Sequence, residues 1–175
     1  AGPENPPAMA IRAPYQATGT KPLLLITPED CHAESLALPH QPVGASFISA
    51  RAATDRAAGV LAADDAAMRD GLARASAHYG IEMTGEMTSD LTDGIGAANW
   101  QGDLRALMAQ TGADHIVMAF QPTGYWHDLL KKEMKASPDL AIHEVMRPYD
   151  GLCWPHAKKG FFPFKEKIPS FLAAL

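Results

Sequence analysis

One stretch, residues 115–128, restricts the fold more than any other part of the sequence. Residues 116–120 form an unbroken apolar run that is too short for a buried helix, and the Gln-Pro-Thr-Gly turn of residues 121–124 ends it. A run of this kind predicts a strand that is buried on both faces. A helix is expected to follow at once, over residues 125–135. A buried strand that leads through a turn into a helix is one arm of an α/β unit, and this architecture binds its ligands at the carboxyl ends of the strands.

Further apolar runs predict four more strands. They cover residues 23–26, 43–49, 81–84 and 140–145. An alanine-rich segment predicts one long helix, or two with a break near Ala63, over residues 54–79, and an amphipathic segment predicts a helix over residues 101–110. Strands that alternate with helices indicate a parallel sheet with right-handed crossovers. The sequence therefore predicts a three-layer α/β fold with a mostly parallel, five-stranded, Rossmann-like sheet.

The 175 residues are expected to form one α/β domain, residues 21–153, between two segments of different character. Residues 1–20 hold four prolines and no periodic pattern, which predicts a flexible leader. Residues 154–175 form a C-terminal tail rich in aromatic and basic side chains. So many large apolar groups are not left in water, so we expect this tail to pack on the domain or on a partner. A long loop is expected over residues 85–100 and a short final helix over residues 170–175.

The composition argues against several classes of function. A net charge of -5 and a pI near 5.8 make nucleic-acid binding by this chain alone unfavourable, because such binding depends on clustered Lys and Arg. No apolar run approaches the roughly 20 residues of a membrane span, so we expect no membrane insertion. Cys31 and Cys153 cannot form a disulfide framework. Without a secretory leader they predict reduced thiols in a cytoplasmic protein.

The common nucleotide-binding and catalytic motifs are absent from the sequence. It contains no G-x-G-x-x-G after the first strand, no G-x-x-x-x-G-K-[ST] and no G-x-S-x-G. Ordinary dehydrogenase, kinase and α/β-hydrolase interpretations lose their main support, and catalytic residues stay unknown. Four zinc-ligand types occur, but adjacent residues such as Cys31 and His32 seldom bind the same ion, so we expect no metal site. The four are Cys31, His32, Cys153 and His156.

The candidate ligand-binding residues follow two strands that are expected to be neighbours. The strand over residues 23–26 begins the sheet and the strand over residues 116–120 follows the crossover that changes sides, so their carboxyl ends should border the gap where the strand order reverses. The helix that begins at Tyr125 offers free N–H groups to an anion, and Gly124 permits close approach to the backbone. The predicted ligand-binding residues are Thr27, Glu29, Asp30, Gln121, Thr123, Gly124 and Tyr125.

Two of these assignments have structural alternatives. Glu29 and Asp30 could cap a following helix against its positive N-terminal dipole rather than meet a ligand. Tyr125 and its neighbour Trp126 could stack on a planar ligand, or one of them could simply pack against the domain. The sequence alone leaves these alternatives open.

Residues 112–117 and 120–124 combine a strand with a turn that contains proline and glycine, and Asp128 stands on the helix just beyond. Residues 154–164 read Trp-Pro-His-Ala-Lys-Lys-Gly-Phe-Phe-Pro-Phe. Together these segments resemble the N-terminal α/β domain of the photolyase and cryptochrome family, in which the second segment leads into the flavin-binding domain. The resemblance covers residues 21–168.

The resemblance implies a ligand- or antenna-chromophore-binding module that lacks the FAD catalytic domain and acts beside a flavin-binding partner domain or as a homo-oligomer. The expected ligand is an antenna chromophore or a nucleotide. No FAD and no photolyase activity are expected on this chain alone, because the helical domain that holds FAD in the family is not among these 175 residues. The alternative is a small nucleotide-binding protein or enzyme of Rossmann-like fold that uses the crevice at the strand ends. A purely structural partner domain is a third hypothesis, so whether the chain is an enzyme stays open.

Overall fold

The computed structural model describes residues 15–16, 18–49, 57–81, 100–158 and 160–174. Its centre is a parallel sheet with the strand order β2-β1-β3-β4. The strands are β1 (Pro22–Ile26), β2 (Gly44–Phe47), β3 (His115–Ala119) and β4 (Ile142–Val145). The α/β class and the parallel sheet are therefore as the sequence predicts.

The number of strands differs from the prediction. In the described part of the chain the sheet has four strands, not five. The missing strand was expected over residues 81–84, but Ile81 lies outside any strand and residues 82–84 lie outside the described residues. A short apolar run beside a helix end is a weak predictor of a strand. Whether such a segment pairs with the edge of a sheet depends on the tertiary structure around it.

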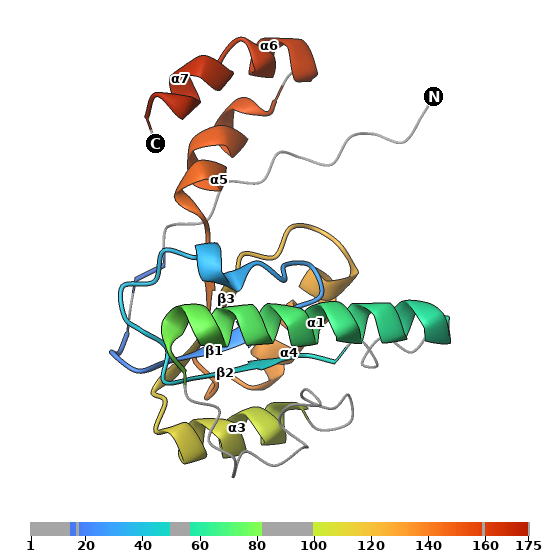
Figure 1. Ribbon diagram of the computed structural model, residues 1–175, viewed down its shortest axis with the longest axis vertical. Coiled ribbons are helices and arrows are strands. Elements are labelled where there is room, and N and C mark those ends of the chain that lie inside the picture. Colours follow the sequence, from blue (N-terminus) through green and yellow to red (C-terminus); the bar gives the residue numbers. More distant parts are fainter. Residues whose placement is uncertain (1–14, 17, 50–56, 82–99, 159, 175) are drawn as a thin grey trace.

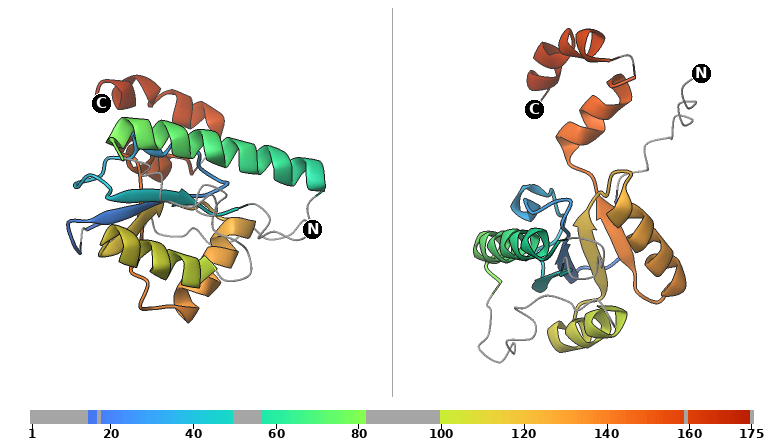
Figure 2. Two further views of the ribbon diagram at one scale, coloured as in Figure 1. Left: turned by 60° about the horizontal axis from the view of Figure 1, so that its bottom comes forward. Right: turned by 90° about the vertical axis from the view of Figure 1, so that its right-hand side faces the viewer.

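Helices cover both faces of the sheet, which gives three layers (Figure 2). The helix α1 (Ala58–Tyr79) and the 3₁₀ turn η1 (Ala33–Ser35) lie on one face, here called the α1 face. The helices α3 (Trp100–Thr111) and α4 (Tyr125–Ala136) lie on the other, the α4 face. Leu23 and Leu25 of β1 enter the core of the α4 face, while Leu24 and Ile26 enter the core of the α1 face. Burial on both faces explains why the strand sequences are continuous apolar runs.

Glycines end two of the helices. Gly80 follows α1 with φ 61° and Gly112 follows α3 with φ 69°, a left-handed backbone that side chains disfavour. The predicted start of the first helix, residues 54–56, lies outside the described residues, and helical residues are described from Ala58 onward. Of the predicted loop, residues 85–99 also lie outside the described residues.

The strand order confirms the expected neighbours. β1 pairs with β3 in parallel register, with Leu23 opposite Ile116 and Leu24 opposite Val117. The connection after β1 runs over the α1 face through η1, whereas the connection after β3 runs over the α4 face through α4. The strand order therefore reverses between β1 and β3, where an open α/β sheet forms its ligand crevice.

After β4 the chain forms a C-terminal arm that projects from the body of the domain (Figure 1). The arm contains α5 (Pro148–Cys153), η3 (Trp154–His156), α6 (Phe161–Lys165) and α7 (Ile168–Leu172). Only a short helix near the end was expected here, because four prolines interrupt the pattern. In the structure each proline stands in the first turn of its helix. A backbone N–H in the first turn has no acceptor within the helix, so proline, which lacks this group, costs the helix no hydrogen bond there.

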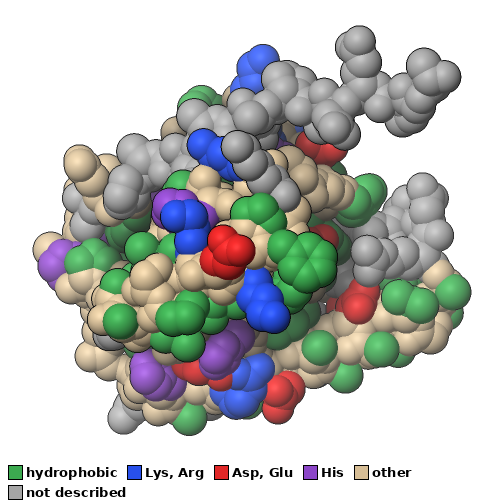
Figure 3. All heavy atoms as spheres, turned by 90° about the horizontal axis from the view of Figure 1, so that it is seen from above, with side chains coloured by type: hydrophobic (Ala, Val, Ile, Leu, Met, Phe, Trp, Pro, Cys, Tyr) green, Lys and Arg blue, Asp and Glu red, His purple; other side chains and the backbone are tan. Residues whose placement is uncertain are grey.

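The aromatic residues of the arm divide into two groups. Phe171 is buried and contacts the rings of Phe164 and His156, so the arm packs partly on itself. Phe161 and Phe162 are 65% and 75% exposed. Figure 3 looks onto this end of the molecule and shows hydrophobic side chains beside Lys and Arg side chains on the surface. The described part of the chain contains no helix long and apolar enough to cross a membrane.

Candidate functional site

The carboxyl ends of β1 and β3 are joined by two buried polar side chains. The Nε2 of Gln121, which follows β3, donates a hydrogen bond of 2.9 Å to Oγ1 of Thr27, which follows β1. Each of these residues is 1% exposed. Both were predicted to line a crevice at this point, and the structure does bring them together. Their side chains occupy the gap between the two strands, so the space for a ligand lies beside them rather than between them.

The orientation of the Gln121 side-chain amide follows from its partners. Its nitrogen lies 2.8 Å from the carbonyl oxygen of Ala119, and a carbonyl can only accept a hydrogen bond, so the NH₂ group must face it. The amide oxygen Oε1 then points the other way. It is buried and has no hydrogen-bond partner among the described residues. A buried acceptor without a partner costs about 1–3 kcal/mol, so it calls for an explanation.

A cavity of about 360 Å³ lies beside Gln121, between α4 and the strands β3 and β4. Its apolar lining comes from Met118, Leu130 and Met134, and its polar lining from Gln121, His127, Lys131 and Glu144. A mainly apolar hollow into which a few polar groups converge is the usual form of a small-molecule site. The cavity is therefore the candidate functional site.

Two polar groups of the cavity are oriented by the backbone of Gln121. The Nδ1 of His127 donates to the carbonyl oxygen of Gln121 at 3.2 Å, which fixes the orientation of the ring. The Oε1 of Glu144 accepts the backbone N–H of Gln121 at 3.1 Å. Sequence reasoning missed His127 and Glu144. A signal existed for Glu144, because it stands inside a predicted strand that is otherwise apolar except for His143.

Asp30 is held by an arginine rather than exposed to a ligand. Nη1 and Nη2 of Arg147 donate to the two carboxylate oxygens of Asp30, Nε donates to Ser35 and Nη2 also donates to the carbonyl of His32. Burial raises the pKa of Asp30, but the hydrogen bonds from Arg147 and from the backbone N–H of His32 outweigh it and hold the pKa below its usual value. Because Arg147 immediately precedes α5, this pair ties the loop after β1 to the base of the arm. The contacts with Arg147 account for the position of Asp30, so neither a ligand contact nor a helix cap is needed to explain it.

The other predicted residues lie at the outer edge of the site. Glu29, Thr123 and Gly124 are exposed, and Tyr125 is 51% exposed with its ring edge-on to that of the buried Trp126. Gly124 precedes the first turn of α4, where no side chain caps the free N–H groups. Of the seven predicted residues, the one that lines the cavity is Gln121.

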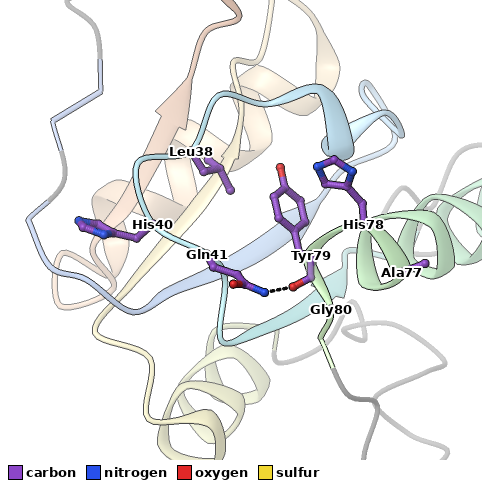
Figure 4. Close-up of a pocket in the computed structure, with 7 residues that line it drawn as sticks. All are labelled: Leu38, His40, Gln41, Ala77, His78, Tyr79 and Gly80. Atoms are coloured by element: carbon purple, nitrogen blue, oxygen red, sulfur yellow. Dashed lines mark hydrogen bonds between the residues drawn. The ribbon is translucent and has the colours of Figure 1, made fainter.

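A second, broader hollow lies at the opposite end of the sheet, between the loop before β2 and the end of α1 (Figure 4). Its volume is about 490 Å³. Its polar groups serve contacts between elements, because Gln41 donates to the carbonyl oxygen of Tyr79 and the Tyr79 hydroxyl faces the carbonyl oxygens of Ala33 and Leu36 at 3.1 and 3.2 Å. The residues that line it are Leu38, His40, Gln41, Ala77, His78, Tyr79 and Gly80. None of them carries a buried polar side-chain atom without a partner in the described structure.

A second polar cluster lies at the amino ends of β3 and β4, and sequence reasoning missed it too. The hydroxyl of Tyr15 donates to Nε2 of the fully buried His115 at 2.5 Å, and Nδ1 of His115 donates to Asp114 at 2.5 Å. The Asp114 carboxylate also accepts the backbone N–H groups of Thr20 and Lys21. The ring of His143 lies beside Tyr15 and His115. This cluster fastens the segment before β1 to the sheet.

Among the described residues, no three His, Cys, Asp or Glu side chains are grouped so that they could hold a metal ion. In comparisons with protein-family models, curated proteins and solved structures, the chain matches none.

Proposed function

We propose that this chain is a ligand-binding α/β domain of the photolyase and cryptochrome N-terminal type, and that it holds one small organic molecule in the cavity between α4, β3 and β4. The observation that carries the proposal is the buried amide oxygen of Gln121, which has no protein partner among the described residues and belongs to a residue that lines the cavity. A ligand that donates a hydrogen bond to this oxygen would remove the cost of its burial. The position beside the β1–β3 switch point also supports a ligand site.

The proposed role is that of a binding module rather than of a photolyase in itself. By the resemblance, the ligand is an antenna chromophore or a nucleotide, and the partner is a flavin-binding domain or a second copy of the chain. The walls of the cavity are Met and Leu side chains, which suit a flat ring more than a flexible polar chain.

One observation favours the alternative of a small enzyme or nucleotide-binding protein. His127 lines the cavity and its ring is oriented by the bond from Nδ1 to the carbonyl of Gln121, so an imidazole, the commonest proton-transfer group in enzymes, stands beside a bound molecule. Under this alternative a bound molecule would be converted and not merely held.

The test is to purify the full chain, denature it and identify the released small molecules by mass spectrometry, and in parallel to titrate the protein with nucleotides and planar heterocycles. Intrinsic fluorescence is a suitable signal, because Trp126 is buried at the start of α4. The matched control pair is Gln121→Leu, which removes the unpartnered oxygen, and Gln41→Leu, which alters the glutamine of the other hollow. Binding that is lost in the first variant and kept in the second supports the proposal. A protein with no bound molecule and no response to any probe would refute it, and conversion of the bound molecule would favour the enzyme.

A further inference from the structure

The outer end of the C-terminal arm presents two neighbouring phenylalanines to the surface. Phe161 and Phe162 begin α6 and are 65% and 75% exposed, and their rings meet edge-on with centroids 5.6 Å apart. The next aromatic residue of the helix, Phe164, instead contacts the buried Phe171 of α7. The arm therefore has a small apolar core of its own, and Phe161 and Phe162 lie outside it.

This aromatic pair belongs to the part of the arm that projects farthest from the sheet. The helices α6 and α7 lie at the outer end of the arm, beyond α5 (Figure 1, Figure 2). Exposed apolar side chains that lie together are a mark of protein or membrane contacts. Two rings that stand out from a projecting end are suited to entering a soft apolar medium, whereas a rigid protein partner would need a hollow shaped to both of them.

The net charge of this segment is opposite in sign to that of the rest of the chain. Residues 154–175 contain four of the 15 basic side chains and one of the 20 acidic ones, a net charge of +3, so the other residues together carry -8. Lys165 follows Phe161 by four residues and Phe162 by three, so it lies on the side of α6 that carries the two rings. Two more exposed lysines flank α6, namely Lys158 and Lys167. The aromatic pair is therefore set in basic surroundings.

We infer that the arm docks on an anionic lipid surface, with Phe161 and Phe162 entering the boundary between headgroups and acyl chains and the lysines facing the headgroups. Large apolar side chains with lysines beside them are the features by which peripheral helices lie on membranes. The negative charge of the lipids complements the arm and repels the acidic remainder of the chain, so the projecting end is the part that meets the surface. The helices α6 and α7 have five residues each, far below the roughly 20 of a membrane span, so the contact is peripheral.

Sedimentation of the full chain with lipid vesicles tests the inference. One set of vesicles is phosphatidylcholine alone, which is neutral overall, and the other is an equal mixture of phosphatidylserine and phosphatidylcholine, which is anionic. The partition coefficient is expected to be at least about tenfold higher for the anionic vesicles, because each lysine close to such a surface contributes about fivefold. High salt should remove most of this difference, because it screens the attraction.

Two arm variants with matched controls on the body test the location. The double variant Phe161→Ala, Phe162→Ala should lower the partition coefficient for anionic vesicles at least about tenfold, because two large apolar groups no longer leave water. Its control is Val60→Ala, which shortens a side chain of α1 that is 46% exposed. Lys165→Gln should lower the coefficient about fivefold, and Lys132→Gln, at an exposed position of α4, should leave it unchanged.

Circular dichroism checks that each variant is folded. The replaced side chains are all exposed, so folding is expected to persist. If the double phenylalanine variant does not fold, Lys165→Gln and its control still decide whether the arm is the docking surface.

Several outcomes would overturn the inference. They are an absence of vesicle binding, equal binding to both kinds of vesicle, and anionic-vesicle binding that survives the double phenylalanine variant or is weakened equally by Lys132→Gln. A different result also counts against it: if the chain forms a dimer in sedimentation velocity that the double variant converts to a monomer, the arm is an interface between copies and not a lipid-docking surface. The inference is independent of the cavity, so none of these results bears on the proposed function.

Discussion

The two ends of the central sheet carry similar polar residues but use them differently. At the amino end, both ring nitrogens of His115 are bonded, one to Tyr15 and one to Asp114. At the carboxyl end, Gln121 uses both of its amide hydrogens, but its oxygen is buried without a partner among the described residues. A polar cluster that satisfies itself holds segments of the chain together. One that leaves a buried group unpaired costs stability unless something else binds there, which is why the carboxyl end is the better candidate for function.

The largest expected effect comes from breaking the amino-end cluster with His115→Leu. The Tyr15 hydroxyl and the Asp114 carboxylate would lose a buried partner, while leucine keeps the apolar contacts. We expect the free energy of unfolding to fall by about 3 kcal/mol, with ligand binding at the other end unchanged. Urea denaturation measures the first quantity and calorimetric titration the second. A loss of binding without a loss of stability would reverse the contrast between the two ends.

A smaller loss is expected from Asp30→Asn, which removes the charge that Arg147 binds at the carboxyl end. Charge-assisted hydrogen bonds contribute about 1.5–3 kcal/mol, and this pair is partly exposed, so about 2 kcal/mol is expected at neutral pH. Burial raises the pKa of Asp30, but the bonds from Arg147 and His32 lower it further, so its net pKa is below the usual value. Stability from this group is therefore complete above about pH 4 and is lost as the pH falls below that.

Urea denaturation at pH 7 and at pH 3 measures this dependence. The difference in free energy of unfolding between the variant and the original chain should be smaller at pH 3 than at pH 7. Asp139→Asn is a suitable control, because Asp139 forms an exposed pair with Arg105 for which no comparable stabilisation is expected. An equal difference at both values of pH would show that the charge of Asp30 is not what stabilises the loop.

The amino end is expected to respond to a milder change of pH through His143. Burial, and to a lesser degree the neighbouring His115, lower the pKa of His143. The unfolded chain therefore binds a proton near the usual pKa of about 6.5, while the folded chain resists it, so stability should decrease as the pH falls from 7 towards 5. His143→Gln should weaken this dependence. The charged or titratable groups of the same cluster are Tyr15, Asp114 and His115, and thermal denaturation of both proteins from pH 5 to pH 7 provides the comparison.

The smallest effect on stability is expected from Gln121→Leu, although Gln121 is as deeply buried as His115. The change removes two hydrogen bonds but also removes an unpartnered buried oxygen, and the two contributions have opposite signs. The free energy of unfolding should change by less than about 1 kcal/mol, while ligand binding is lost. Urea denaturation of this variant beside His115→Leu shows directly whether the two ends differ as proposed. A loss as large as that of His115→Leu would mean that Gln121 serves the fold and not a ligand.

Local sequence patterns were sufficient for the central elements of the fold. The apolar run of residues 116–120 and the period of residues 101–110 each depend on interactions within a few residues of the chain. They correspond to β3 and α3 in the structure. The arm was largely missed, because a proline counts against a helix unless its position in the first turn is known, and local patterns did not reveal that position.

The sequence by itself determined the α/β class and the neighbourhood of β1 and β3, because hydrophobic periodicity and the rules of parallel crossovers depend on short segments. Only the tertiary structure decided which polar groups would be paired. Tyr15 meets His115 across 100 positions and Arg147 meets Asp30 across 117. The same folding left the Gln121 oxygen without a partner among the described residues, beside a cavity lined from α4 and β4. A hydrogen bond depends on distances of a few ångströms between segments that are far apart in the chain, so no local pattern could assign Asp30 to an arginine or predict that the Gln121 oxygen lacks a partner among the described residues.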